Sequence, residues 1–85
     1  MKVVLKLYAS LTDYLPERGR ELRHEVALDV PAGATISSII DQFKLPRPQV
    51  HLVLVNGLYV EPHLRATRAL RDGDHLAIWP PVAGG

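Results

Sequence analysis

The sequence ends in Leu76-Ala77-Ile78-Trp79-Pro80-Pro81-Val82-Ala83-Gly84-Gly85, and the rest of the expected fold follows from this stretch. Residues 76–79 are apolar and predict a strand. The prolines end it, because proline has no N–H for a sheet ladder and a fixed φ. The side chains of residues 80–85 carry no charge. The two glycines have no Cβ, so their backbone fits a channel that larger residues would block. We expect a folded domain over residues 1–79 and a flexible tail over residues 80–85 that presents its carboxylate to another protein. The alternative is an ordinary frayed end.

Length and composition indicate one small domain. The chain has 85 residues, of which 47% are hydrophobic and 22% charged, as in globular proteins with a single core. The net charge of +1 comes from interspersed acids and bases, so no basic stripe marks a nucleic-acid partner. No apolar run is long enough to cross a bilayer, and no export signal is evident. We therefore expect a cytoplasmic protein without nucleic-acid or membrane partners.

The first part of the chain predicts two strands joined by a turn and a loop. Apolar residues alternate over residues 2–8 and again over residues 22–30, and the two segments are expected to pair. A charged, solvated loop is expected over residues 17–21. Before it, Ser10 is expected to cap a short helical turn whose apolar face comprises Leu11, Tyr14 and Leu15.

One helix is expected in the middle of the chain. Thr35 is a suitable N-cap, and Pro46 and Pro48 prevent the helix from continuing beyond about Lys44. The apolar residues follow the spacing of a single buried stripe, which comprises Ile36, Ile39, Ile40 and Phe43.

Three further strands are expected after the helix. Residues 50–55 are rich in β-branched residues and predict a strand buried on both faces. Asn56-Gly57 is a strong hairpin signal, with residues 58–60 as the returning strand. Asp72-Gly73-Asp74 predicts a turn into the last strand, residues 75–79.

This order of elements favours an α+β fold. Five strands form a mixed sheet, and one main helix packs across one face of it, so each apolar face is buried once. The first and last strands are the most apolar and are expected to be parallel neighbours in the middle of the sheet. This is the β-grasp, or ubiquitin-like, arrangement.

Several short motifs resemble those of one known family. Val55-Asn56-Gly57, Asp72-Gly73-Asp74, an apolar strand and the Pro-Pro-Val-Ala-Gly-Gly end are similar to the MoaD/ThiS sulfur carriers, and most of all to MoaD, the small subunit of molybdopterin synthase. In element order the resemblance covers nearly the whole chain, and it is specific in residues 72–85. The segments 11–16 and 45–50 depart from the MoaD pattern and leave the sulfur acceptor open.

The resemblance implies a chemistry at the end of the chain. In the family, an adenylating enzyme of the ubiquitin-activating type joins the terminal carboxylate to AMP from ATP, and sulfur then displaces AMP to give a thiocarboxylate. By position, the reactive carbonyl belongs to Gly85, and Gly84 lets the tail enter the partner sites. The chain itself would bind no cofactor, because ATP belongs to the activating enzyme. The absence of cysteine agrees, since the sulfur would be carried on the terminal carbonyl.

The implied partners are the adenylating enzyme and a sulfur-accepting, MoaE-like synthase large subunit. An apolar sheet surface and the tail are expected to bind them. The candidate residues are Tyr8, Leu58, Tyr59, Trp79, Pro80, Pro81, Val82 and Ala83, of which the aromatic ones could instead complete the core.

Three other functions fit the same sequence. The chain could be a ubiquitin-like modifier that is conjugated to lysines through Gly85, or a carrier for another pathway such as thiamine thiazole synthesis. It could also be a docking domain with an incidental Gly-Gly end. Adding a residue after Gly85 would abolish both covalent functions and spare the third.

The remaining polar residues do not indicate catalysis by the chain alone. His24, His51, His63 and His75 lack the spacing of a metal site, so no metal is expected. Asp72 and Asp74 are interpreted as turn formers, and no nucleophile or phosphate-binding motif is present. We expect a carrier subunit that is the substrate of other enzymes.

Overall fold

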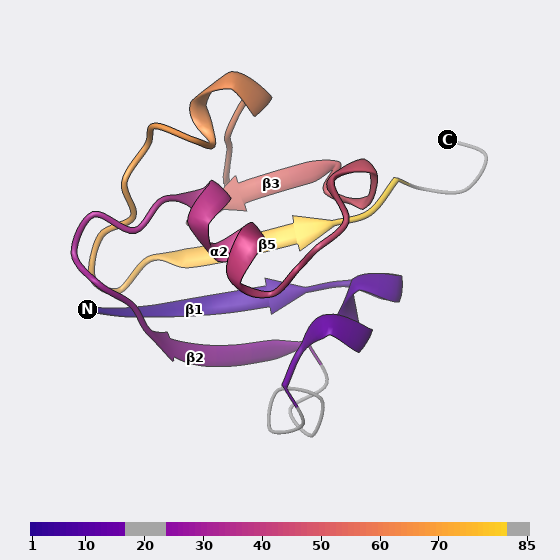
Figure 1. Ribbon diagram of the computed structural model, residues 1–85, viewed down its shortest axis with the longest axis horizontal. Coiled ribbons are helices and arrows are strands. Elements are labelled where there is room, and N and C mark those ends of the chain that lie inside the picture. Colours follow the sequence, from indigo (N-terminus) through magenta and orange to yellow (C-terminus); the bar gives the residue numbers. More distant parts are fainter. Residues whose placement is uncertain (17–23, 82–85) are drawn as a thin grey trace.

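The computed structural model describes residues 1–16 and 24–81 and contains a five-stranded mixed sheet in the order β2-β1-β5-β3-β4 (Figure 1). β1 and β5 are parallel neighbours, and the other pairs are antiparallel. This confirms the predicted α+β architecture and the central place of the first and last strands. The elements are β1 (Lys2–Leu7), β2 (Glu25–Asp29), α2 (Ile36–Gln42), β3 (Leu52–Val55), β4 (Leu58–Tyr59) and β5 (His75–Trp79).

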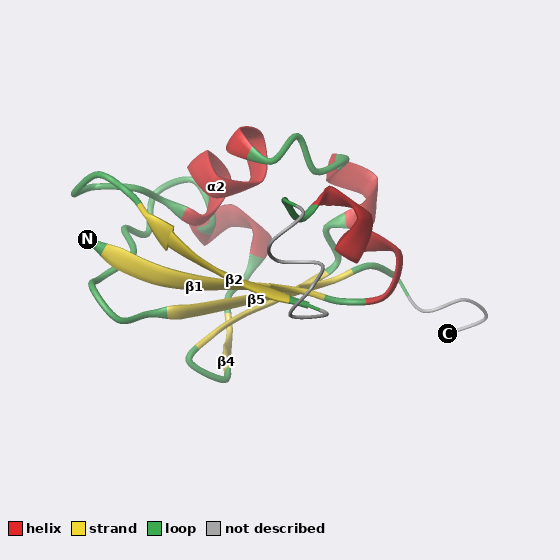
Figure 2. Ribbon diagram, turned by 90° about the horizontal axis from the view of Figure 1, so that it is seen from below, coloured by secondary structure: helices red, strands yellow, loops and turns green. Residues whose placement is uncertain are grey.

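The helical elements lie on one side of the sheet, as Figure 2 shows. Besides α2 they are the short 3-10 helices η1 (Ala9–Tyr14), η2 (Arg47–Gln49) and η3 (Pro62–Leu64). The core lies between these helices and the sheet. Its most deeply buried side chains are Val3, Leu5, Leu7, Leu11, Leu15, Ile36, Ile39, Ile40, Val53, Val55, Leu76 and Ile78.

Helix α2 begins as predicted and ends by a different device. Thr35 Oγ1 accepts from Ser38 N at 3.1 Å while Ser38 Oγ accepts from Thr35 N at 2.9 Å, a reciprocal capping box. At the other end, Lys44 adopts a φ of 55° and Leu45 N donates to Ile40 O at 3.0 Å. Lys44 N donates to Asp41 O at 3.1 Å, and these two bonds form a Schellman motif, which ends the helix before the prolines are reached.

Three details of the predicted elements were wrong. Ser10 does not cap η1: the N-cap position is Tyr8, without a side-chain hydrogen bond. Tyr14 does not join Leu11 and Leu15 in the core but stays 40% exposed. Exposure keeps its hydroxyl group hydrated. The third strand begins at Leu52, because η2 ends at Gln49 and Val50 is its C-cap. Its residues 52 and 54 are half-buried, so one face of the strand is not covered. The second strand begins at Glu25; residues 22–23 and the predicted loop 17–21 lie outside the described residues.

Both predicted turns are confirmed. Asn56 and Gly57 have φ values of 52° and 82°, as the hairpin between β3 and β4 requires. Gly73, at φ 87°, makes the turn before β5. Asp74 Oδ2 accepts from Arg71 N at 2.8 Å within the turn, whereas Asp72 Oδ1 accepts from Lys2 N at 2.7 Å and ties the turn to β1.

Candidate functional site

Strand β5 ends where the sequence predicted. The Trp79 carbonyl accepts the last ladder hydrogen bond, from the His51 N–H at 3.0 Å. Pro80 is buried and Pro81 exposed, and neither has an N–H with which to extend the sheet. The chain therefore leaves the sheet at these prolines, at the same end of the sheet as η1 (Figure 1).

Three rings stack beside this exit. The rings of Tyr8 and Trp79 are parallel within 2°, with centroids 4.1 Å apart. The His24 ring stacks on Tyr8 with a centroid distance of 5.2 Å. All three residues are half-buried. Stacked rings restrain one another and keep apolar area in contact, so the sheet surface around the exit is preformed.

The stack belongs to a larger apolar surface on the side of the sheet opposite α2, which we call the open face. Cross-strand partners lie on the same side of a sheet, and the pairs Lys6–Ala77, Ala77–Leu54, Leu54–Tyr59 and Leu52–Trp79 all fall here. Within the described residues no helix covers this side (Figure 2). The open face comprises the apolar and aromatic residues Val4, Tyr8, Ala27, Leu52, Leu54, Tyr59, Ala77 and Trp79 and, toward β2, the charged residues Lys2, Lys6, Glu25 and Asp29.

The structure separates two candidate residues that are adjacent in sequence. Tyr59 is on the open face and 53% exposed. Leu58, 68% exposed, pairs with the buried Val55 and so lies on the other side of the sheet. The open face thus brings together Tyr8, Tyr59 and Trp79, and it leaves Leu58 out.

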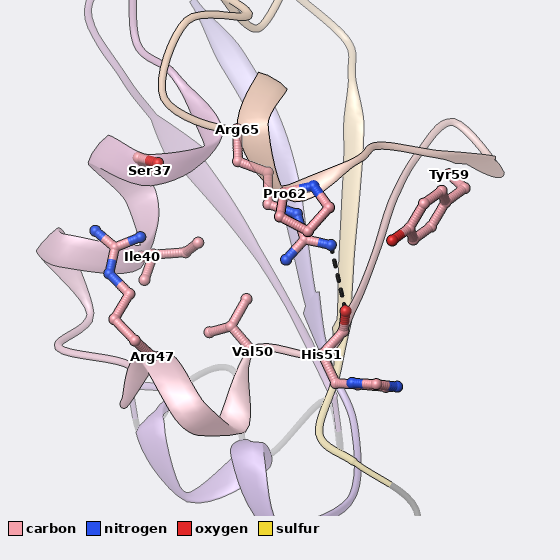
Figure 3. A pocket seen from close by; sticks show the side chains of 8 residues that line it. All are labelled: Ser37, Ile40, Arg47, Val50, His51, Tyr59, Pro62 and Arg65. Carbon is pink, nitrogen blue, oxygen red and sulfur yellow. Dashed lines mark hydrogen bonds between the residues drawn. The ribbon is translucent and has the colours of Figure 1, made fainter.

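The leucines of the open face and a buried arginine were not predicted from the sequence. Leu52 and Leu54 were assigned to the core because alternation alone does not show which face of an apolar strand is covered. Arg65, in the charged segment after β4, is 7% exposed, and no periodicity marked it. It lines a pocket of about 380 Å³ between α2, η2 and η3 (Figure 3).

The proposed tail residues Val82, Ala83, Gly84 and Gly85 lie outside the described residues. Within residues 1–16 and 24–81, no group of three or more histidines and acids could hold a metal ion. The same part of the chain contains no helix with the length and hydropathy needed to span a membrane.

A model of the ThiS family matches residues 14–85. No curated protein matches the chain in sequence. Among solved structures, SAMP1 of Haloferax volcanii, a small archaeal modifier protein, is similar over all of both chains, with 25% identity and a TM-score of 0.68.

Two further structures share the fold. A protein described as subunit 1 of a molybdopterin converting factor from Pyrococcus furiosus is 23% identical, with a TM-score of 0.66 over 96% of this chain and 99% of that one. A chain from the complex of subunits 1 and 2 of the Helicobacter pylori molybdopterin-converting factor is 16% identical, with a TM-score of 0.61 over all of both chains. The fold is therefore one that MoaD-like subunits and ubiquitin-like modifiers have in common.

Proposed function

The chain belongs to the ThiS family, and from this premise we propose that it is a sulfur carrier that works through the carboxylate of Gly85. One observation carries the proposal: the family match continues to residue 85, beyond the prolines at which the chain leaves the sheet. The folded domain then binds the partner proteins. The tail, residues 80–85, has small side chains and enters their active sites.

The proposed chemistry has two steps. The Gly85 carboxylate attacks the α-phosphorus of ATP at an adenylating enzyme, which releases pyrophosphate and leaves an acyl adenylate. Hydrosulfide then adds to this carbonyl, and AMP departs to give the thiocarboxylate. Adenylation is needed because a carboxylate is a poor electrophile, and the activated intermediate divides one difficult step into two easier ones. Since the first step consumes ATP, the proposal sets the protein in the cytoplasm.

The open face is the proposed docking surface for the adenylating enzyme and for a synthase large subunit. It adjoins the tail exit, so a protein bound there has its active site within reach of the tail. The Helicobacter pylori neighbour was solved with its own subunit 2, which supports a MoaE-like large subunit as the acceptor and molybdopterin synthesis as the pathway. In this role Trp79, Tyr8 and Tyr59 contact the surface of the partner, and residues 80–83 occupy the channel that leads to its active site.

Intact mass spectrometry tests the thiocarboxylate. The chain ending at Gly85 is incubated with an adenylating enzyme of a ThiS/MoaD system, ATP and sulfide. We expect the mass to rise by the difference between sulfur and oxygen, and the rise to vanish without ATP. An unchanged mass, with an enzyme that converts its own carrier in the same tube, would overturn the proposal.

A second function, conjugation to lysines, is supported by the likeness to SAMP1 of Haloferax volcanii at 25% identity. It requires the same adenylation, and its product is an isopeptide bond between Gly85 and a lysine Nζ. Immunoblots of cells that express an N-terminally tagged chain separate the two. Slow-migrating bands that are lost on deletion of Gly85 would establish modification, and their absence together with the mass change would leave the carrier function alone.

A further inference from the structure

The guanidinium of Arg65 is buried without a carboxylate partner. Arg65 Nε donates to Val60 O at 3.1 Å and Nη2 donates to His51 O at 3.2 Å, so two backbone carbonyls hold the group in place. Among residues 1–16 and 24–81, no acid forms an ion pair with it. A buried charge that lacks a counter-charge is unfavourable unless an anion is supplied.

The acids closest in sequence to the pocket are already engaged. Asp41 Oδ1 is 2.6 Å from Arg47 Nη2, which neutralises the second arginine of the pocket. Glu61 Oε2 is 3.4 Å from His63 Nδ1. Both carboxylates therefore have other partners, and neither forms an ion pair with Arg65.

One nitrogen of Arg65 faces the pocket. No described residue accepts a hydrogen bond from Nη1, and the described part of the chain has no fully buried side-chain nitrogen or oxygen without a partner. Nη1 must therefore reach open space. Figure 3 shows it on the side of the guanidinium away from the bond to His51, facing Val50.

We propose that this pocket binds the carboxylate of an aspartate or glutamate side chain from a partner protein. One uncompensated guanidinium matches a singly charged carboxylate. A phosphate dianion fits less well, because Arg47, the second arginine of the pocket, is already paired with Asp41, which leaves one guanidinium for two charges. Ile40, Val50 and Pro62 provide apolar walls for the methylene stem of the acid, and Ser37 and Tyr59 provide hydroxyls at the rim.

Tyr59 connects the pocket to the open face, since it belongs to both. The assignment of the acid to a docked partner rests on the proposed function, because that partner would cover Tyr59. Recognition of a carboxylate by Arg65 does not depend on sulfur transfer. The two can fail independently.

The test is an NMR titration of the ¹⁵N-labelled chain. The probes are N-acetylglutamate amide and N-acetylglutamine amide, which differ in the carboxylate, and inorganic phosphate at the same ionic strength. We expect the glutamate probe to produce saturable shifts of the Arg65 Nε–Hε signal and the His51 and Ser37 amides, and the glutamine probe to produce none.

Two variants complete the test. Arg65→Lys keeps the positive charge but loses the planar guanidinium, which can donate two hydrogen bonds to one carboxylate. It should weaken binding of the glutamate probe at least tenfold. Arg68→Gln removes an exposed arginine that does not line this pocket and should leave binding unchanged. If Arg65→Lys does not fold, the wild-type titration still decides. Equal shifts with both amide probes, stronger saturation by phosphate, or no saturation at all would each overturn the carboxylate assignment.

Discussion

Asn56 Nδ2 donates a hydrogen bond of 2.8 Å to Asp74 Oδ1 and thereby joins the β3–β4 hairpin turn to the turn before β5. Asn56 Oδ1 in return accepts from His75 N at 2.9 Å. Asp74 is 9% exposed, so this contact is largely shielded from water. The two turns act as one unit that sets where β5 begins, and through β5 where the tail leaves the sheet.

We predict that Asn56 and Asp74 are energetically coupled. Asn56→Gly keeps the positive φ but loses both side-chain bonds, and Asp74→Ala leaves Asn56 and the Arg71 N–H unpaired. Each should lower the free energy of unfolding by about 1–3 kcal/mol. Urea unfolding of both single variants and the double variant should give a coupling energy of about 0.5–1.5 kcal/mol. Strictly additive losses would show that the bond contributes nothing of its own.

We predict that Tyr59→Ala weakens binding of the adenylating enzyme and spares the fold. The ring is about half exposed on the open face, so its loss leaves no cavity. A central aromatic contact of an interface contributes at least about 1.4 kcal/mol, a tenfold rise in Kd. Calorimetric titration measures Kd, and thermal unfolding checks Tm.

Leu58→Ala is the matched control for Tyr59→Ala. It removes an even more exposed side chain of the same strand, but on the other side of the sheet. Its Kd should equal that of the wild type. A loss of binding from Leu58→Ala, with none from Tyr59→Ala, would place the interface on the wrong side of the sheet.

The acid dependence of stability should include Asp29. Lys2 Nζ lies 3.1 Å from Asp29 Oδ2. Its hydrogen bond, and after that its positive charge, hold the pKa of the Asp29 carboxyl below the ordinary value. The N-terminal ammonium lowers this pKa further. Because the pKa is lower in the folded chain, the ionised form favours folding. That stability is present above the unfolded pKa and is lost as the pH falls through the folded one.

The corresponding variant is Asp29→Asn. Its Tm should lie slightly below that of the wild type near neutral pH, with the gap closing in acid and in high salt, since the pair is exposed. Asp13→Asn, at an exposed acid of η1 without an ion pair among the described residues, is the control. A gap that stays constant from neutral to acid pH would exclude the role assigned to Lys2.

Much of the fold could be predicted because local signals agree with the tertiary contacts. The Thr35 cap, the Asn56-Gly57 hairpin and the double proline after Trp79 each restrict the backbone whatever surrounds them. The end of α2 could not be predicted, because Lys44 adopts a left-handed φ that rarely occurs in residues other than glycine. The start of β3 was misplaced because prolines 46 and 48 favour a 3-10 turn that draws in Val50.

The site was less predictable than the fold. The tail motif and the stacked aromatic residues were found as single residues, but the open face depends on register, which brings Tyr59, Ala77 and Lys6 to one side. Arg65 could not be identified, because its burial results from carbonyls that the fold brings together from residues 51 and 60. Sequence patterns report periodicity along an element and carry little information about such irregular segments.

ATP–pyrophosphate exchange by the adenylating enzyme shows directly whether the Gly85 carboxylate is the reacting group. The chain ending at Gly85 is compared with the same chain extended by one alanine, which moves the carboxylate by one residue and leaves the folded domain unchanged. We expect exchange that depends on the first chain and is absent with the second. Equal exchange with both chains, or none with either while the enzyme's own carrier supports it, would contradict the claim.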